Sequence, residues 1–223
     1  PRSTPLYSSA ASDVYKRQDH SGGLDSLGKV VAIDDYLFGP GFSGDPVASK
    51  PSEPNNKLTY QTCLAGQNWQ WPLPNMNSLR IDVIWPSPAG PIEGNNSSCV
   101  LLLSWADQQI LLTGDIEARA EREILKAGSL PNSAMTALVA PHHGSKTSSS
   151  LAFLKHTRPQ TAVISSGYAN RFGHPHPSVT QRLQGTDVSL YHTAAEGALE
   201  FKIVPGEALE VSAYREIHRR YWM

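Results

Sequence analysis

The sequence predicts a layered α/β fold in which helices cover the faces of a sheet. Between residues 78 and 115, apolar runs follow one another and pair as strands. From residue 115 onward, helical periodicity alternates with short apolar runs. This order of elements is the pattern of a sheet covered by helices.

Composition narrows the classes of protein to consider. The chain has 223 residues, of which 39% are hydrophobic and 17% charged, which suits one domain or at most two small ones. The formal net charge is −1, so contact with nucleic acid would have to come from local patches and not from a basic field over the whole chain. The sequence contains no apolar run of about 18 residues, so we expect no transmembrane segment in this chain.

The first part of the chain is expected to hold few regular elements. Residues 1–18 show neither helical nor strand periodicity and are expected to be a non-native or disordered leader. A short apolar run from Lys29 to Ile33 predicts a strand, and residues 39–58, rich in Gly, Pro and Ser, predict a loop. Residues 78–85 predict a half-buried strand that ends at Pro86. Its apolar face would hold Leu79, Ile81, Val83 and Trp85.

From residue 99 onward the sequence predicts a series of strands and helices. Two apolar runs around a polar turn at 106–109 predict a β-hairpin. A helix is expected over 116–128, with Gly128 as its C-terminal cap. Further strands are expected at 135–141, 160–167, 188–193 and 197–204, and further helices at 148–159, with a serine cap, and at 177–184, with Pro177 in its first turn.

Three sequence features are candidates for a chemical site. The first is "DHSGG", in which Asp19 and His20 could bind one divalent ion if the two glycines turn the backbone sharply. The same pair could equally be a chance neighbour of glycines in a loop. The second is Asp115, which ends an apolar strand after Gly114. This carboxylate would either cap the following helix or bridge metal ions, and the two roles are compatible.

The third feature is a set of paired histidines. "VAPHHGS" places His142 and His143 at a strand end, and "RFGHPHP" places His174 and His176 between prolines. Buried imidazoles need hydrogen-bond partners, which a metal ion or a carboxylate supplies. The alternatives are a structural histidine pair and a rigid exposed turn. Because each cluster follows a strand or precedes a helix, the clusters can converge on one pocket.

The order of these motifs resembles the metallo-β-lactamase fold, a four-layer αββα sandwich with a metal site along one sheet edge. The sequence is most similar to the C-terminal hydrolase-like domain of ComEC-type competence proteins, which are membrane channels that take up transforming DNA. The resemblance extends from Asp19 to the C-terminus. It rests on "DHSGGL", "CLAGQNWQW", "NNSSCVLLLS", "LLTGDIEARAEREIL", "LVAPHHGSKTSSS", "VISSGYANRFGHPHPSV" and "YREIHRRYWM".

The resemblance implies roles for individual residues. It implies metal binding by Asp19, His20 and Asp115, and by either His142 or His143, of which His142, nearer the strand end, is favoured. It implies that His143, His174 and His176 complete the site, face the scissile phosphate or protonate the leaving oxygen, and that Asn170, Arg171 and Lys146 bind substrate.

Three positions depart from the family pattern, and one of them is "YHTAAEGAL", which replaces a more typical Arg-Thr-Asp lead-in. The family motif begins His-x-Asp-x-Asp-His, and its first half is missing before Asp19, so we expect an α/β sandwich that is incomplete at the N-terminus and a site that is impaired. Where other members of the fold have a histidine, this chain has "NNSSCV". The domain is expected over 19–214, followed by a basic tail over 215–223.

The function implied by the resemblance is metal-dependent hydrolysis of phosphodiester bonds in the DNA strand that is not imported. The cofactor would be Zn²⁺ or Mn²⁺, with two ions in the intact parent protein. The partners would be single-stranded DNA and the channel portion of the same polypeptide. Two other functions stay open: a non-catalytic module that guides DNA, and a phosphoesterase acting on a small or lipid-linked substrate.

The resemblance also implies a position outside the cytoplasmic membrane, as a periplasmic domain of an inner-membrane protein. The two cysteines, Cys63 and Cys99, are either a pair of thiols or one disulfide. An oxidising compartment would permit the disulfide.

Overall fold

A computed structural model describes residues 35–40, 59–73, 76–89 and 94–218. Asp19, His20, the strand expected at 29–33 and most of the loop expected at 39–58 lie outside these ranges. The chain divides into two compact units, residues 1–37 with 42–61, and residues 38–41 with 62–223. The strands β1 (Asp35–Phe38) and β2 (Thr59–Thr62) form a two-stranded sheet, and the second unit holds all the elements described below.

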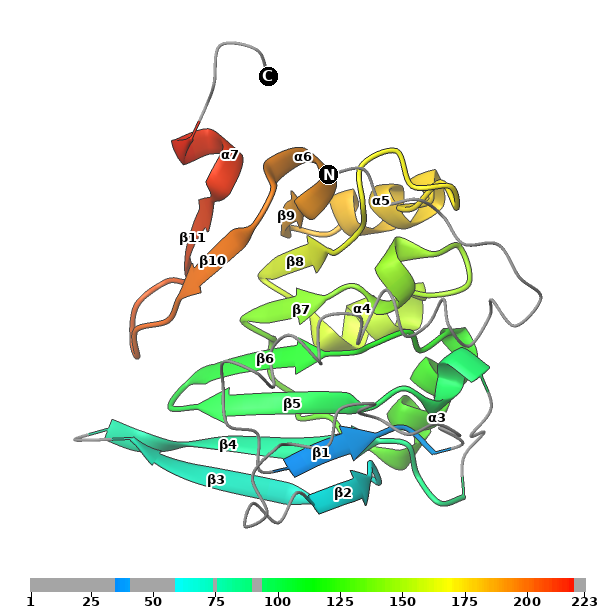
Figure 1. Cartoon of the computed structure of the whole chain (residues 1–223), viewed down its shortest axis with the longest axis vertical. Helices are drawn as coiled ribbons and strands as arrows, with labels where there is room; N and C mark the ends of the chain where they lie inside the picture. The colour runs from blue at the N-terminus through cyan, green and yellow to red at the C-terminus, as the bar shows by residue number, and fades with distance from the viewer. Residues whose placement is uncertain (1–34, 41–58, 74–75, 90–93, 219–223) are drawn as a thin grey trace, which may run out of the picture. The chain divides into compact units, whose positions relative to one another are not determined.

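A seven-stranded mixed sheet is the centre of the second unit (Figure 1). Its strands, in spatial order, are β3 (Asn68–Leu73), β4 (Met76–Trp85), β5 (Val100–Trp105), β6 (Gln108–Leu112), β7 (Ala137–Val139), β8 (Thr161–Ile164) and β9 (Ser189–His192). Neighbours from β3 to β6 are antiparallel, and neighbours from β6 to β9 are parallel. The seven strands have the same order across the sheet as along the sequence.

Three helices connect the parallel strands. They are α3 (Ala118–Ala127), α4 (Leu151–Thr157) and α5 (Pro177–Gln184). The three helices lie on the same face of the sheet (Figure 1). This follows from the strand order, because crossovers between parallel strands are generally right-handed and each of these steps moves one strand in the same direction. One buried apolar cluster joins this sheet face to the helices; among its members are Leu102, Leu111, Leu138, Ile124, Phe153 and Leu183.

The structure confirms the α/β class and most of the expected elements. The hairpin is β5 and β6, and the residues of the expected helices at 148–159 and 177–184 contain α4 and α5. Ser150 caps α4 by accepting a hydrogen bond from the N–H of Phe153, and Gly128 ends α3 in the left-handed conformation. Serine at the start of a helix is a reliable local signal because its hydroxyl accepts from a backbone N–H that has no partner within the helix. Glycine after the end is a reliable signal because it adopts the left-handed conformation that terminates the helix.

Other details differ from the expectations. Helix α3 begins at Ala118 with Glu117 at its N-cap position, so Asp115 does not cap the helix. The strand β3 and the strand β11 (Glu210–Ala213) were not predicted from the sequence, and β11 pairs with β10 (Leu199–Lys202) in a separate two-stranded sheet. The short helices α6 (Thr193–Glu196) and α7 (Tyr214–Ile217), and the 3₁₀ turns η1 (Gly94–Ser97) and η2 (Pro141–Gly144), complete the described elements.

A buried carboxyl group joins α3 to the loop that leads into α4. Glu121 on α3 is fully buried. Its Oε1 accepts the N–H of Ser149 at 2.5 Å, and its Oε2 accepts the N–H of Ser150 at 2.8 Å. Burial raises the pKa of Glu121, although both serines and the charge of Arg182 act in the opposite direction. Glu121 therefore supplies acceptors to two N–H groups that are removed from water.

We expect Glu121→Ala to lower the free energy of unfolding by about 2 kcal/mol, because two buried N–H groups lose their acceptors. Glu123→Ala on the same helix is the matched control: Glu123 forms an exposed ion pair with Lys126, and its loss should leave stability close to that of the parent. Chemical denaturation of the three proteins measures the difference. Equal stability of the Glu121 and Glu123 variants would contradict this role.

A glutamine variant tests the raised pKa. The folded state holds the proton of Glu121 more tightly than the unfolded chain does, so the associated stability is present at acid pH and is lost as the pH rises through the folded-state pKa. Glutamine cannot ionise. The stability of Glu121→Gln relative to the parent should therefore improve as the pH rises above the ordinary pKa of a glutamate, as chemical denaturation at several pH values would measure.

Candidate functional site

The backbone after β7 makes an unusual turn. His142, His143 and Gly144 have φ angles of 50°, 55° and 77°, so three consecutive residues lie in the left-handed region. A residue with a side chain costs roughly 1–2 kcal/mol in this conformation. Such conformations persist where the surrounding structure enforces them, and they concentrate at functional sites. The conformation of the turn therefore makes the imidazoles of His142 and His143 candidates for a functional role.

Two glycines let neighbouring loops approach this turn closely. A Cβ atom on Gly144 would lie 2.8 Å from Cβ of Pro175, and a Cβ atom on Gly114 would lie 2.8 Å from Cβ of Ser98. The backbone joins the same segments, since the N–H of His142 donates to the carbonyl of Gly114 and the N–H of His176 donates to the carbonyl of Gly144, each at 2.9 Å. The loops after β6, β7 and β8 therefore meet at one edge of the sheet.

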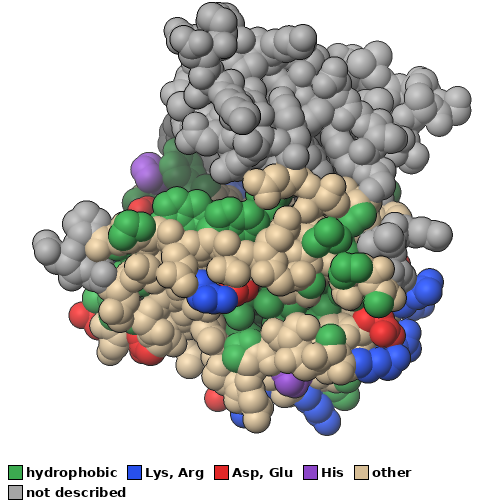
Figure 2. Space-filling model, turned by 90° about the horizontal axis from the view of Figure 1, so that it is seen from below, with side chains coloured by type: hydrophobic (Ala, Val, Ile, Leu, Met, Phe, Trp, Pro, Cys, Tyr) green, Lys and Arg blue, Asp and Glu red, His purple; other side chains and the backbone are tan. Residues whose placement is uncertain are grey.

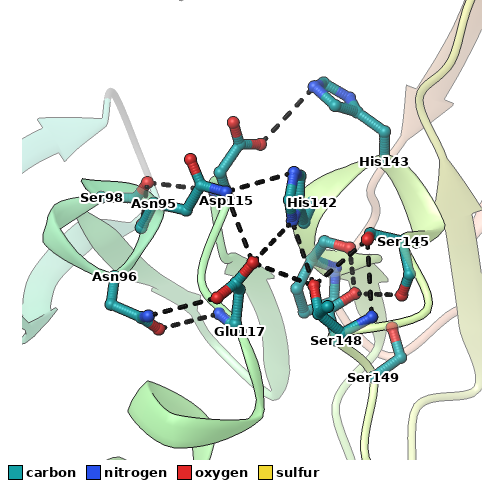
Figure 3. Close-up of polar contacts among 12 residues, drawn as sticks. Asn95, Asn96, Ser98, Asp115, Glu117, His142, His143, Ser145, Ser148 and Ser149 are labelled. Carbon is teal, nitrogen blue, oxygen red and sulfur yellow. Dashed lines mark hydrogen bonds and ion pairs between the residues drawn. The ribbon is translucent and has the colours of Figure 1, made fainter. Parts of the chain in front are cut away.

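Asp115 and His143 face each other at this edge (Figure 3). Oδ1 of Asp115 lies 3.5 Å from Nε2 of His143. Nδ1 of His143 lies 2.7 Å from the carbonyl oxygen of Ser165. Since a carbonyl oxygen only accepts, Nδ1 of His143 carries a proton and donates it to this hydrogen bond, and Nε2 is the ring nitrogen that faces Asp115.

His142 belongs to a second polar group in the same view (Figure 3). Its Nδ1 lies 3.5 Å from Oε1 of Glu117, and its Nε2 lies 3.3 Å from Nδ2 of Asn95. The amide of Asn95 can only donate at Nδ2, so Nε2 accepts and Nδ1 carries the proton toward Glu117. Both ring nitrogens of His142 thus have partners among the described residues.

Glu117 is the centre of this group, and the sequence analysis did not select it. Its carboxylate accepts from Thr147 Oγ1 at 2.9 Å and from the side-chain amides of Asn95 and Asn96 at 3.4 Å each. The N–H of Glu117 donates to Oδ1 of Asn96 at 3.0 Å. The signal in the sequence was the spacing "TGDIE", in which a second carboxylate follows Asp115 by two residues. The asparagines belong to "NNSSCV", the segment at which other members of the fold have a histidine.

His174 completes the group of rings at this edge. Its ring centroid lies 5.8 Å from that of His142, in an edge-on arrangement, and 5.7 Å from that of Phe172, in a stacked arrangement. Burial lowers the pKa of His174, and the neighbouring imidazoles of His142 and His143 lower it further, whereas Asp115 opposes them. Nδ1 of His174 is buried without a hydrogen-bond partner among the described residues.

The other selected residues have different surroundings. Nδ1 of His176 accepts the N–H of Ser178 and so caps α5, which gives His176 a structural contact. Lys146 is exposed beside the histidine turn, and the guanidinium of Arg171 lies 5.0 Å from the ring centroid of Phe172. The amide of Asn170 bonds the backbone of its own loop.

The donor atoms at the sheet edge suit a divalent metal ion in their chemistry. Imidazole nitrogen and carboxylate oxygen are ligands of Zn²⁺ and Mn²⁺. The bond from His143 to the carbonyl of Ser165 is the kind of outer contact that fixes the tautomer of a metal-binding histidine. Within the described ranges, however, no group of three or more His, Cys, Asp or Glu side chains is placed to hold one ion. The described part of the chain contributes the pair Asp115 and His143, while Asp19 and His20 lie outside it.

A disulfide lies next to the asparagine loop. Cys63 and Cys99 are bonded, with their Cα atoms 5.9 Å apart. Cys99 follows Ser98, whose Oγ accepts the N–H of Asp115 at 3.1 Å. Of the two states that the sequence left open, the structure has the bridge.

The chain is similar in sequence to several curated proteins. It is 34% identical over 208 residues to competence protein ComA of Neisseria gonorrhoeae, a match that covers 92% of this chain and 26% of that protein. It is 30% identical over 187 residues to ComE operon protein 3 of Bacillus subtilis, covering 83% of this chain and 23% of that protein. Its homologues are ComA/ComEC competence proteins.

A third curated protein is also similar in sequence to this chain. The chain is also 33% identical over 180 residues to recombination protein 2 of Haemophilus influenzae, covering 80% of this chain and 20% of that protein. The chain thus spans about a quarter of the length of the competence proteins it matches. No protein-family model matches it.

A solved structure of a metallo-β-lactamase superfamily protein from Thermotoga maritima also resembles this chain. The match has a TM-score of 0.32 and 9% identity, and it covers 71% of this chain and 80% of the other. Within the described ranges, every helix is too short or too polar to cross a bilayer.

We expect Gly144→Ala to lower the free energy of unfolding by roughly 2 kcal/mol, because the new Cβ atom meets Pro175 and the backbone φ is positive. Gly167→Ala is the control, since a Cβ atom there meets nothing within 4 Å and its φ is ordinary. Thermal unfolding of the two variants beside the parent measures the effect. If the Gly144 variant were as stable as the Gly167 variant, the close approach of Pro175 to Gly144 would not contribute to stability.

The disulfide predicts no free thiol in unreduced, denatured protein and two after reduction. Thiol quantification with a chromogenic reagent measures both states. Two reactive thiols before reduction, in protein purified from an oxidising compartment, would exclude the bridge.

Proposed function

We propose that this chain is the hydrolase-like domain of a competence protein and that it cleaves phosphodiester bonds in the DNA strand that is not imported. The observation that supports this proposal most is the meeting of Asp115, His143 and His174 at one sheet edge. These residues come from three separate loops, after β6, β7 and β8. Side chains of this kind gathered from separate loops are typical of a catalytic centre.

The proposed ligands are Asp19, His20 and Asp115, to which the geometry adds His143. His142, the histidine that the resemblance favoured, has its two ring nitrogens against Glu117 and Asn95 and is left out of this ligand set. A divalent ion held by such ligands lowers the pKa of water and offsets negative charge on a phosphate. Zn²⁺ and Mn²⁺ both suit this mixture of nitrogen and oxygen donors.

The protein's own residues have separate tasks in this proposal. Asp115 supplies a carboxylate that is 13% exposed, so its charge is only weakly screened by water. Glu117 orients the ring of His142, while Asn95 holds the other nitrogen of that ring. His174, beside His142, is placed to exchange a proton with the substrate. Lys146 and Arg171, both exposed, would contact phosphate groups.

The surface gives little support to long-range attraction of DNA. Figure 2 shows described Lys and Arg side chains scattered among acidic ones on the face that it presents. With a net charge of −1, substrate capture would depend on contacts near the site and on the channel portion of the same polypeptide. We therefore propose that the domain acts on DNA delivered to it, in the periplasm, beside that channel.

A non-catalytic role in guiding DNA is the second candidate. The observation that favours it is that no group of three or more His, Cys, Asp or Glu side chains within the described ranges is placed to hold one ion. Titration of the chain with Mn²⁺ or Zn²⁺ separates the two functions, since a guiding module needs no tight divalent ion. A phosphoesterase acting on small or lipid-linked substrates is separated by the choice of substrate.

We expect the full-length parent domain to cleave single-stranded DNA in the presence of Mn²⁺, and Asp115→Ala in that domain to lower the rate on the order of 100-fold, because a ligand and a largely buried charge are both lost. Asp187→Ala is the matched control, because Asp187 is exposed in the connection between α5 and β9. Gel analysis of a labelled oligonucleotide measures the rates, and a chelator should abolish cleavage by the parent. Equal rates for the parent and the Asp115 variant would defeat the proposal.

A further inference from the structure

The loop between β8 and α5 contains His174, and one side chain in it bonds the backbone of that histidine. Asn170 accepts the N–H of His174 at Oδ1, at 2.9 Å. Through Nδ2 it donates to the carbonyl oxygen of His174 at 2.6 Å and to that of Gly167 at 3.0 Å. One amide therefore holds both polar backbone groups of His174.

These contacts use both hydrogens of the amide. A primary amide has two N–H donors and one carbonyl acceptor. The donors of Asn170 are directed at two carbonyl oxygens, and its acceptor receives the N–H of His174. No donor is left for a phosphate group, so binding of substrate by this side chain would require the loop contacts to break.

Other contacts hold the same residue. Ser166 Oγ donates to the carbonyl oxygen of His174 at 3.3 Å, and Nε2 of His192 lies 2.6 Å from that Oγ. The ring of Phe172 stacks on the ring of His174 at 5.7 Å with an interplanar angle of 21°. The backbone and the ring of His174 are thus both fixed from within the second unit, beside His142.

We propose that Asn170 is a positioning residue: its amide fixes His174 in the histidine group and does not bind substrate. This inference rests on the proposed function for its consequence in catalysis, whereas the fixation itself is independent of any activity. It replaces the substrate-binding role that the sequence resemblance implied for Asn170.

The first test measures the fixation in metal-free protein. Asn170→Ala should speed hydrogen exchange at the amide of His174 by about tenfold, the loss expected for one hydrogen bond, and should shift the ring resonances of His174 in NMR spectra. Asn77→Ala is the control, because Asn77 is an exposed asparagine on β4. Unchanged exchange and ring resonances in the Asn170 variant would overturn the inference.

The second test is a double-mutant cycle with His174→Ala in the DNA cleavage assay. A positioning residue acts through its partner, so Asn170→Ala should lower kcat at nearly unchanged KM in the parent and should add nothing when His174 is already alanine. An equal loss in both backgrounds, or a rise in KM alone, would assign Asn170 to the substrate and overturn the inference. A parent chain that cleaves no phosphodiester would defeat the proposed function, while the exchange rate would still decide whether Asn170 fixes His174.

Discussion

The left-handed turn at His142, His143 and Gly144 is the constraint on which the rest of the site depends. Three consecutive positive φ angles reverse the chain immediately after β7 and present both imidazoles at the sheet edge. The carbonyl of Gly114 receives the N–H of His142, and the carbonyl of Gly144 receives the N–H of His176. A different backbone conformation would remove both bonds, and with them the approach of the loops before and after the turn.

The cost of this turn is offset by the packing around it. Glu121, buried on α3, accepts two N–H groups from the segment that follows the turn, and Arg182 on α5 donates to the carbonyl of Ser148 in the same segment at 2.9 Å. Thr113 at the end of β6 donates to the carbonyl of Val139 on β7 at 2.7 Å. The helices on one face of the sheet thereby stabilise a backbone that would not persist alone. The turn that these contacts stabilise also contains the candidate ligand His143.

The two histidines of the turn have different surroundings, although they are adjacent in sequence. His143 bonds the carbonyl of Ser165 and faces Asp115, an arrangement suited to a metal ligand. His142 lies between Glu117 and Asn95, so both of its nitrogens are occupied by protein groups. The chain is similar to competence proteins, but the assignment of each histidine comes from these contacts.

The sequence by itself determined the α/β class, the β5–β6 hairpin, the caps of α3 and α4, and the general location of the candidate site. These features follow from local physics: apolar periodicity, the capping chemistry of serine and glycine, and histidines beside strand ends. Only the tertiary structure decided that Glu117 belongs to the site, that Asp115 does not cap α3, and that Asn170 bonds the backbone of His174. The contacts of Glu117 depend on which distant segments lie opposite it, whereas those of Asp115 and Asn170 depend on where the helix begins and how the loop folds, and local sequence patterns do not specify these.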